Sequence, residues 1–137
     1  YLLGHAYGQD FRYDEMLLTG DGDQGKATAD FVASDNSFAE NTLKPGEGPT
    51  KEEREAGSYD VLFAATTNDG QLLLTSVKGD KDPGYGSTSK MLAESALCLL
   101  HNPELGSGGI YTPAAVMAEA LIARLGDNAG LTFTIEA

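Results

Sequence analysis

The sequence predicts an α+β fold in which a mixed, mainly antiparallel sheet packs against helices. Two neighbouring apolar runs, residues 59–66 and 71–78, are joined by the turn sequence TNDG and predict a β-hairpin. Two amphipathic helices and a final alternating strand are predicted further along the chain. Because strands and helices do not alternate regularly, this order favours an α+β arrangement over a doubly wound parallel sheet.

The composition limits the possible partners and locations. The chain has 137 residues, and we expect residues 1–137 to form a single domain. A formal net charge of −12 argues against binding to nucleic acid or to anionic lipid surfaces. A single cysteine, Cys98, fits a reducing and therefore cytoplasmic location. The chain opens at Tyr1 without an initiator methionine or a signal-peptide leader, so we expect it to be cut from a longer protein.

The N-terminal third is predicted to contain one strand and one helix. Residues 9–18 combine β-favouring aromatics with some alternation and predict a strand that ends near Thr19. The glycine-rich turn TGDGDQG follows, with Asp23 as the expected helix cap. Residues 26–43 then predict one helix, with a potential break at the SDN sequence of residues 34–36.

The centre of the chain gives the clearest structural prediction. Residues 44–57 predict a loop that leads into a short, solvated helix stopped by Gly57. In the hairpin turn we expect positive φ at residues 68–70, which are Asn, Asp and Gly. Both strand runs are almost continuously apolar, so we expect the hairpin to be covered on both faces.

The C-terminal part predicts two helices and a strand. The first helix is expected to begin at Ser87 or Thr88 as the N-cap and to end at Asn102. The second is expected to begin at Pro113, behind the N-cap Thr112, and to continue until the glycine at position 126. The closing run LTFTIEA alternates as a half-buried strand.

Three glycines of residues 19–26, TGDGDQGK, have the G-x-G-x-x-G spacing of a dinucleotide-binding turn. Such a turn also needs a second strand that ends in an acidic residue about twenty positions later. Glu40 lies near that distance, but its surroundings do not resemble a buried strand. Asp21 and Asp23 would also oppose a pyrophosphate inside the turn. We therefore expect no cofactor-binding residues in this chain.

Metal and nucleophile motifs are incomplete. The turn places Asp21 and Asp23 as in an EF-hand loop, but Lys26 and Val32 occupy the positions that require glycine and glutamate. A lone Cys-x-x-His pair at residues 98–101 does not predict zinc, and no nucleophile elbow is found. We expect no metal site.

The loop GDKDPGYGSTSK, residues 79–90, is the main candidate site. Its Gly79 and Gly84 have the spacing of a phosphate-binding P-loop, but Tyr85 stands where the lysine is required. Charged and hydroxyl groups nevertheless crowd between a strand and a helix: Lys78, Asp80, Lys81, Asp82 and Tyr85. Two interpretations stay open, a surface turn that feeds the helix and a substrate-facing loop that binds an anionic or carbonyl group.

Four stretches together resemble the C-terminal half of the saccharopine dehydrogenase-like oxidoreductases. This NADP-linked group includes saccharopine reductase relatives and the mycobacterial trans-acting enoyl reductases. The matching stretches lie at 44–63, 77–99, 108–125 and in the closing AGLTFTIEA. The resemblance implies an N-terminal Rossmann domain upstream that holds NADP. It also implies a second domain that supplies substrate contacts, closes over the nicotinamide and contributes to a homodimer.

The resemblance also suggests roles for the loop. The family's GD-x-DPGY-x-x-T run matches residues 79–88, which with the preceding lysine gives the predicted substrate-binding set: Lys78, Asp80, Asp82, Gly84, Tyr85 and Thr88. Tyr85 is the best candidate for a catalytic residue, as a hydrogen-bond donor to a substrate carbonyl. The parent protein is expected to pass a hydride from NADPH to a carbonyl, imine or enoyl substrate, and this chain is expected to be inactive alone. The alternative is a non-catalytic dimerisation module, in which the hairpin and helix faces pair with a second copy.

Overall fold

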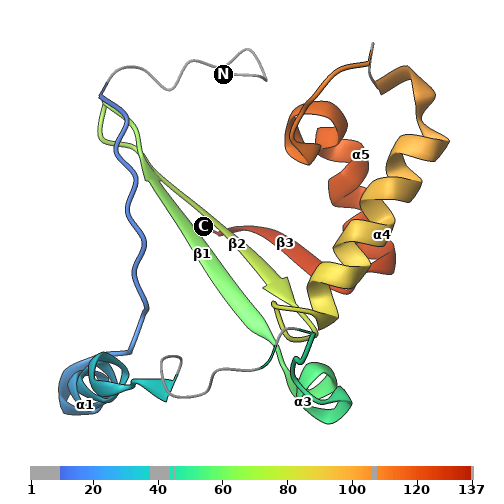
Figure 1. Ribbon diagram of the computed structural model, residues 1–137. Helices are drawn as coiled ribbons and strands as arrows, with labels where there is room; N and C mark the ends of the chain where they lie inside the picture. The colour runs from blue at the N-terminus through green and yellow to red at the C-terminus, as the bar shows by residue number, and fades with distance from the viewer. Residues whose placement is uncertain (1–9, 38–43, 45, 106–107, 137) are drawn as a thin grey trace. The chain divides into compact units, whose positions relative to one another are not determined.

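The computed structural model describes residues 10–37, 44, 46–105 and 108–136. Its contacts divide the chain into two compact units, Tyr1–Glu47 and Gly48–Ala137, which are described separately. The elements in chain order are α1 (Gly22–Ser34), α3 (Lys51–Ala56), β1 (Tyr59–Thr66), β2 (Leu72–Gly79), α4 (Gly86–His101), the 3-10 helix η1 (Pro103–Leu105), α5 (Pro113–Asn128) and β3 (Leu131–Glu136) (Figure 1). The α+β prediction is confirmed, whereas one domain over residues 1–137 stays a prediction.

In the first unit, the described part contains helix α1 and corrects two predictions. Residues 10–18 form no strand, since β-favouring side chains need a partner strand and the described sheet consists of β1, β2 and β3 alone. Helix α1 begins four residues before the predicted start and ends at Ser34, so the break at residues 34–36 is confirmed. The earlier start places Asp21 at the N-cap and Asp23 inside the first turn, so the predicted cap is wrong. Residues 38–43 of the predicted helix lie outside the described residues.

The second unit is built on a three-stranded sheet in the order β1-β2-β3. Both strand pairs are antiparallel, so the mixed pairing that was predicted is absent from the described sheet. At the hairpin turn the N–H of Gly70 donates to the Thr67 carbonyl at 2.9 Å, and Gly70 has a φ of +86°. Of the predicted positions 68–70, only this glycine has a positive φ, as in a type I turn followed by a left-handed residue.

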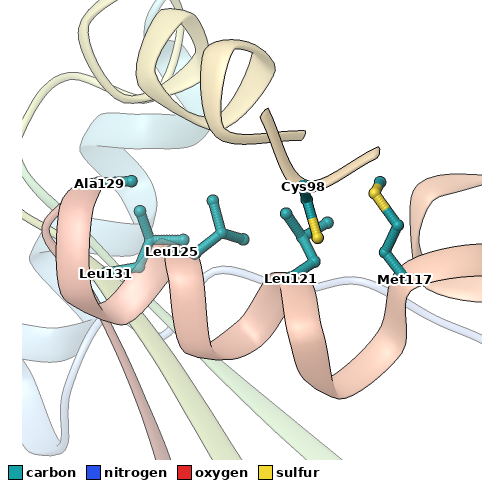
Figure 2. Packing of buried hydrophobic residues seen from close by; sticks show 6 residues of the cluster. All are labelled: Cys98, Met117, Leu121, Leu125, Ala129 and Leu131. Carbon is teal, nitrogen blue, oxygen red and sulfur yellow. The ribbon is translucent and has the colours of Figure 1, made fainter. Parts of the chain in front are cut away.

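Helices α4 and α5 form the core with the start of β3. Figure 2 shows the buried cluster, which consists of Cys98 of α4, Met117, Leu121 and Leu125 of α5, its C-cap Ala129, and Leu131 of β3. Helix α5 begins at Pro113 as predicted but continues past the glycine at position 126 to Asn128. It is kinked at Ala118, whose φ of 29° and ψ of −113° are not helical. Cys98 is a free, fully buried thiol.

The hairpin is not covered on both faces, which corrects the prediction. In Figure 1, α4 and α5 lie beside the end of the sheet where β2 finishes and β3 begins. Side chains nearer the hairpin turn are open to solvent, among them Leu62, Phe63 and Leu73. The final strand is likewise buried only at its start, since Leu131 is buried and Ile135 is exposed.

Candidate functional site

The β2–α4 loop, residues 80–85, is organised around the carboxylate of Asp82. Its oxygens accept backbone N–H groups from Gly84 at 2.9 Å, Tyr85 at 3.2 Å and Gly86 at 2.5 Å. These donors are the free N–H groups at the start of α4, where a negative charge is also favoured by the helix dipole. They hold the pKa of the Asp82 carboxyl below its ordinary value, and the N–H of Gly86 contributes most. The N-cap residue of α4 is Tyr85, Asp82 binds the N–H groups around it from three residues earlier, and the predicted caps Ser87 and Thr88 lie inside the helix.

The backbone of the same aspartate ties the loop to α3. The Asp82 N–H donates to the Arg54 carbonyl at 3.1 Å, and the Asp82 carbonyl accepts the Ser87 N–H at 2.8 Å. Gly57 lies so close that a Cβ at its position would be 2.7 Å from Asp82 Cα. Helix α3 is itself fixed by a capping box between Thr50 and Glu53. A side chain at position 57 would therefore push α3 and the loop apart.

A second carboxylate, that of Asp80, joins the loop to α4 and to the turn before β3. Asp80 Oδ1 lies 2.5 Å from Lys90 Nζ, and this hydrogen-bonded ion pair lowers the pKa of the Asp80 carboxyl. Gly130 has a φ of +71°, and a Cβ there would lie 2.3 Å from Asp80 Oδ2. Thr88 also bonds within the loop region, with its hydroxyl donating to the Pro83 carbonyl at 2.6 Å.

Tyr59 lies beside the start of the loop, where β2 ends. It pairs with Gly79 across β1 and β2, and a Cβ at Gly79 would lie 2.2 Å from the Tyr59 ring. The Tyr59 hydroxyl is 2.8 Å from the hydroxyl of Ser87, which is fully buried at the start of α4. Sequence reasoning missed both Tyr59 and Ser87. The hairpin register contains the signal, because it places an aromatic residue directly opposite a glycine.

The predicted substrate-binding residues do not all meet. Asp80, Asp82, Gly84, Tyr85 and Thr88 share the loop and the first turn of α4, as predicted. Lys78 instead pairs with Asp60 at 2.8 Å on the opposite face of the sheet from Tyr59, and this ion pair raises the pKa of Lys78.

Tyr85 has a side chain that is open to solvent. It is 57% exposed, and its ring lies against Gly48, where a Cβ would be 3.2 Å from the ring. Within the described residues its hydroxyl has no hydrogen-bond partner. The backbone N–H groups that could bind an anion are already taken by Asp82, which leaves the exposed phenol of Tyr85 as a hydrogen-bond donor that a ligand could reach.

The glycine-rich turn before α1 does not fit a dinucleotide. Gly20 and Gly22 have φ values of +87° and +65°, and a Cβ at Gly25 would lie 2.0 Å from the Gly20 carbonyl oxygen. The three glycines thus serve the shape of the turn itself. In the described residues no strand precedes the turn, and Asp21 and Asp23 stand at the helix N-terminus where a phosphate would bind. Glu40 lies outside the described residues.

The remaining motifs give no site in the described part of the chain. Cys98 is buried in the core, whereas His101 lies at the end of α4, with its Nδ1 3.5 Å from Arg124 Nη1. No group of three or more His, Cys, Asp or Glu side chains that could hold a metal ion occurs among the described residues. Among these residues, too, none of the helices has the length and apolar character needed to cross a membrane.

Comparison with known proteins identifies relatives that match most of the chain. A trans-acting enoyl reductase of Mycobacterium tuberculosis is 34% identical over 143 residues, which cover 90% of this chain and 34% of that protein. Trans-acting enoyl reductases of Mycobacterium ulcerans and Mycobacterium bovis are each 33% identical over 139 residues, covering 88% of this chain and 33% of those proteins. No family model and no solved structure matches.

The chain spans about a third of the length of these curated relatives. The match extends over nearly all of the chain. The chain is therefore homologous to one part of the mycobacterial trans-acting enoyl reductases.

Proposed function

We propose that this chain is the C-terminal substrate and interaction domain of a saccharopine dehydrogenase-like, NADP-dependent oxidoreductase, and that it is inactive alone. The homology to enoyl reductases over 90% of the chain carries this proposal. The parent protein would reduce a carbonyl, imine or enoyl group in the cytoplasm. NADPH, when bound by the parent, supplies the hydride. Since the turn at residues 19–26 does not fit a dinucleotide, the cofactor would be held by an N-terminal Rossmann domain in the rest of the parent.

The role proposed for Tyr85 is to donate a hydrogen bond to the substrate carbonyl oxygen. Its hydroxyl is exposed and unpaired within the described residues, and its backbone N–H is fixed by Asp82. Reduction of an enoyl group at its β-carbon moves negative charge onto the conjugated carbonyl oxygen, and a fixed donor stabilises that charge. Asp80, Asp82, Gly84 and Thr88 then act as positioning residues that shape the loop, while contact of Lys78 with substrate stays a prediction.

The test is Tyr85→Phe in the full-length parent, assayed with NADPH and a short trans-2-enoyl thioester. Removal of one such donor is expected to lower kcat/KM by about 100-fold and to leave the Kd for NADPH unchanged. Tyr111→Phe is the matched control, because Tyr111 is also exposed and its hydroxyl donates to the Gly108 carbonyl at 3.3 Å. Unchanged turnover and substrate affinity in Tyr85→Phe would contradict the assigned role.

The alternative is a non-catalytic homodimerisation module, and the exposed apolar side chains of β1 favour it. Val61, Leu62 and Phe63 are 42%, 46% and 52% exposed, respectively. Size-exclusion chromatography with light scattering on the 137-residue chain tests this alternative. A monomer at all concentrations would count against it, whereas a concentration-dependent dimer would support it.

A further inference from the structure

Helix α3 contains two basic residues that make different contacts. Lys51 is exposed, and its Nζ lies 3.8 Å from Glu55 Oε1 on the same helix. Arg54 is half-buried, and its Nη1 donates a hydrogen bond to the Pro49 carbonyl at 2.6 Å. This bond joins the last turn of α3 to the residues that precede the helix. The guanidinium of Arg54 therefore holds Pro49 in place beside α3.

The segment that Arg54 holds also contacts the ring of Tyr85. Gly48 directly precedes Pro49, and a Cβ at Gly48 would lie 3.2 Å from Tyr85 Cε2. The peptide bond before Pro49 is planar and the proline ring fixes φ, so little freedom separates the Pro49 carbonyl from Gly48. Fixing this carbonyl therefore also fixes the surface on which the Tyr85 ring lies.

The backbone of Arg54 is linked to the backbone of Tyr85 through Asp82. The Arg54 carbonyl accepts the Asp82 N–H at 3.1 Å, and the Asp82 carboxylate accepts the Tyr85 N–H at 3.2 Å. A Cβ at Gly86 would lie 3.1 Å from the same Arg54 carbonyl oxygen, so α3 packs closely on the start of α4. The N–H of Gly86 contributes most to the lowered pKa of the Asp82 carboxyl, and the charge of Arg54 adds to this effect. One residue of α3 is thus linked to both the ring and the backbone of Tyr85.

We propose that Arg54 is a positioning residue that fixes Tyr85 through both its side chain and its backbone. This inference rests on the function proposed for the Tyr85 hydroxyl. A donor stabilises the charge on a carbonyl oxygen best when it is held in place before the reaction. A ring without support would sample several rotamers, and a misplacement of about 1 Å can lower a rate by about 100-fold. Arg54 therefore raises kcat through Tyr85 and needs no contact with the substrate.

Fluorine NMR of the 137-residue chain, labelled with fluorotyrosine, tests the position of the ring without any substrate. The chain has six tyrosines, and the resonance that disappears in Tyr85→Phe belongs to Tyr85. Arg54→Met removes the donor to Pro49 and is expected to shift this resonance. Gly48→Ala places a methyl group against the ring and is expected to shift it as well. Lys51→Met, which removes the same charge from the same helix, is expected to leave it in place.

Two comparisons separate a change at the ring from a general loss of structure. Arg54→Lys keeps a positively charged donor and is expected to return the Tyr85 resonance towards its wild-type position. The resonance of Tyr111, whose hydroxyl donates to the Gly108 carbonyl, is expected to stay in place in every variant. An unchanged Tyr85 resonance in both Arg54→Met and Gly48→Ala would overturn the inference.

Turnover of the full-length parent, with NADPH and a short trans-2-enoyl thioester, tests the route through Tyr85. Arg54→Met is expected to lower kcat by about 10-fold at an unchanged KM, and Lys51→Met is expected to match the wild type. In a Tyr85→Phe background, Arg54→Met is expected to change kcat by less than about 2-fold, because the donor that it positions is absent.

A loss of equal size in both backgrounds would overturn the inference, because Arg54 would then act independently of Tyr85. Wild-type turnover of Tyr85→Phe alone would instead contradict the proposed function. The fluorine resonance is measured without substrate, so it still decides whether Arg54 fixes the ring, and the two failures remain distinguishable.

Discussion

The hydrogen bond between Tyr59 and Ser87 is expected to fix the start of α4 to the sheet. Tyr59→Phe removes one oxygen atom and leaves the fully buried Ser87 hydroxyl without the partner that lies 2.8 Å away. An unpaired buried hydroxyl costs about 1–2 kcal/mol of unfolding free energy. Ser87→Ala should cost about 1 kcal/mol, and the double variant should cost no more than Tyr59→Phe alone, because no unpaired group remains.

Urea unfolding of the 137-residue chain, followed by circular dichroism, measures these differences. The four proteins form a double-mutant cycle with an expected coupling energy of about 1 kcal/mol. In a thermal scan, each kcal/mol corresponds to a shift in Tm on the order of 5 °C for a domain of this size. Tyr111→Phe, which alters an exposed tyrosine, should change stability by less than about 0.5 kcal/mol. Additive effects of Tyr59→Phe and Ser87→Ala would refute the reasoning.

Three further predictions follow from the same contacts. Gly79→Ala should destabilise the chain by about 1–3 kcal/mol, because its Cβ would lie 2.2 Å from the Tyr59 ring, whereas Gly126→Ala, with its nearest atom at 3.8 Å, should be neutral or stabilising in urea unfolding. The pKa of Asp82 is lowered in the folded state, so its stabilising contribution should be present at neutral pH and lost as the pH falls below about 4. Asp82→Asn should therefore be less stable than the wild type at pH 7 and lose less stability on acidification, and identical pH profiles would contradict this. Leu121→Ala, in the core, should cost about 2–5 kcal/mol, while Leu100→Ala, at a 70% exposed position, should cost less than about 0.5 kcal/mol; equal costs would argue against the described core.

The sequence predicted correctly those element bounds that depend on neighbouring residues. Strand β1 matches its predicted bounds, because Gly70 fixes the turn and the flanking runs then fix the pairing. The start of α5 is likewise set by Thr112 and Pro113. The strand expected at residues 9–18 failed because β-favouring side chains cannot form a strand without a neighbour.

The candidate loop was recognised from its residues, but its internal organisation was not. A helix cap was sought at Ser87 or Thr88, whereas the carboxylate of Asp82 reaches three N–H groups from outside the helix. Gly130 and Tyr59 are distant along the chain, so only the folded structure brings them to the loop. Much of the charge that suggested a ligand site is used to hold the loop, which leaves the exposed phenol of Tyr85 as the main candidate.

Calorimetric titration with NADPH, on the full-length parent and on the 137-residue chain, tests the central claim most directly. We predict saturable binding to the parent and no saturable binding to the chain. In the glycine turn at residues 19–26, the Gly20 carbonyl oxygen fills the space beside Gly25, and the carboxylates of Asp21 and Asp23 would repel a phosphate. A parent that does not bind NADPH would contradict the proposed oxidoreductase function. Saturable binding to the chain would contradict the placement of the cofactor outside it.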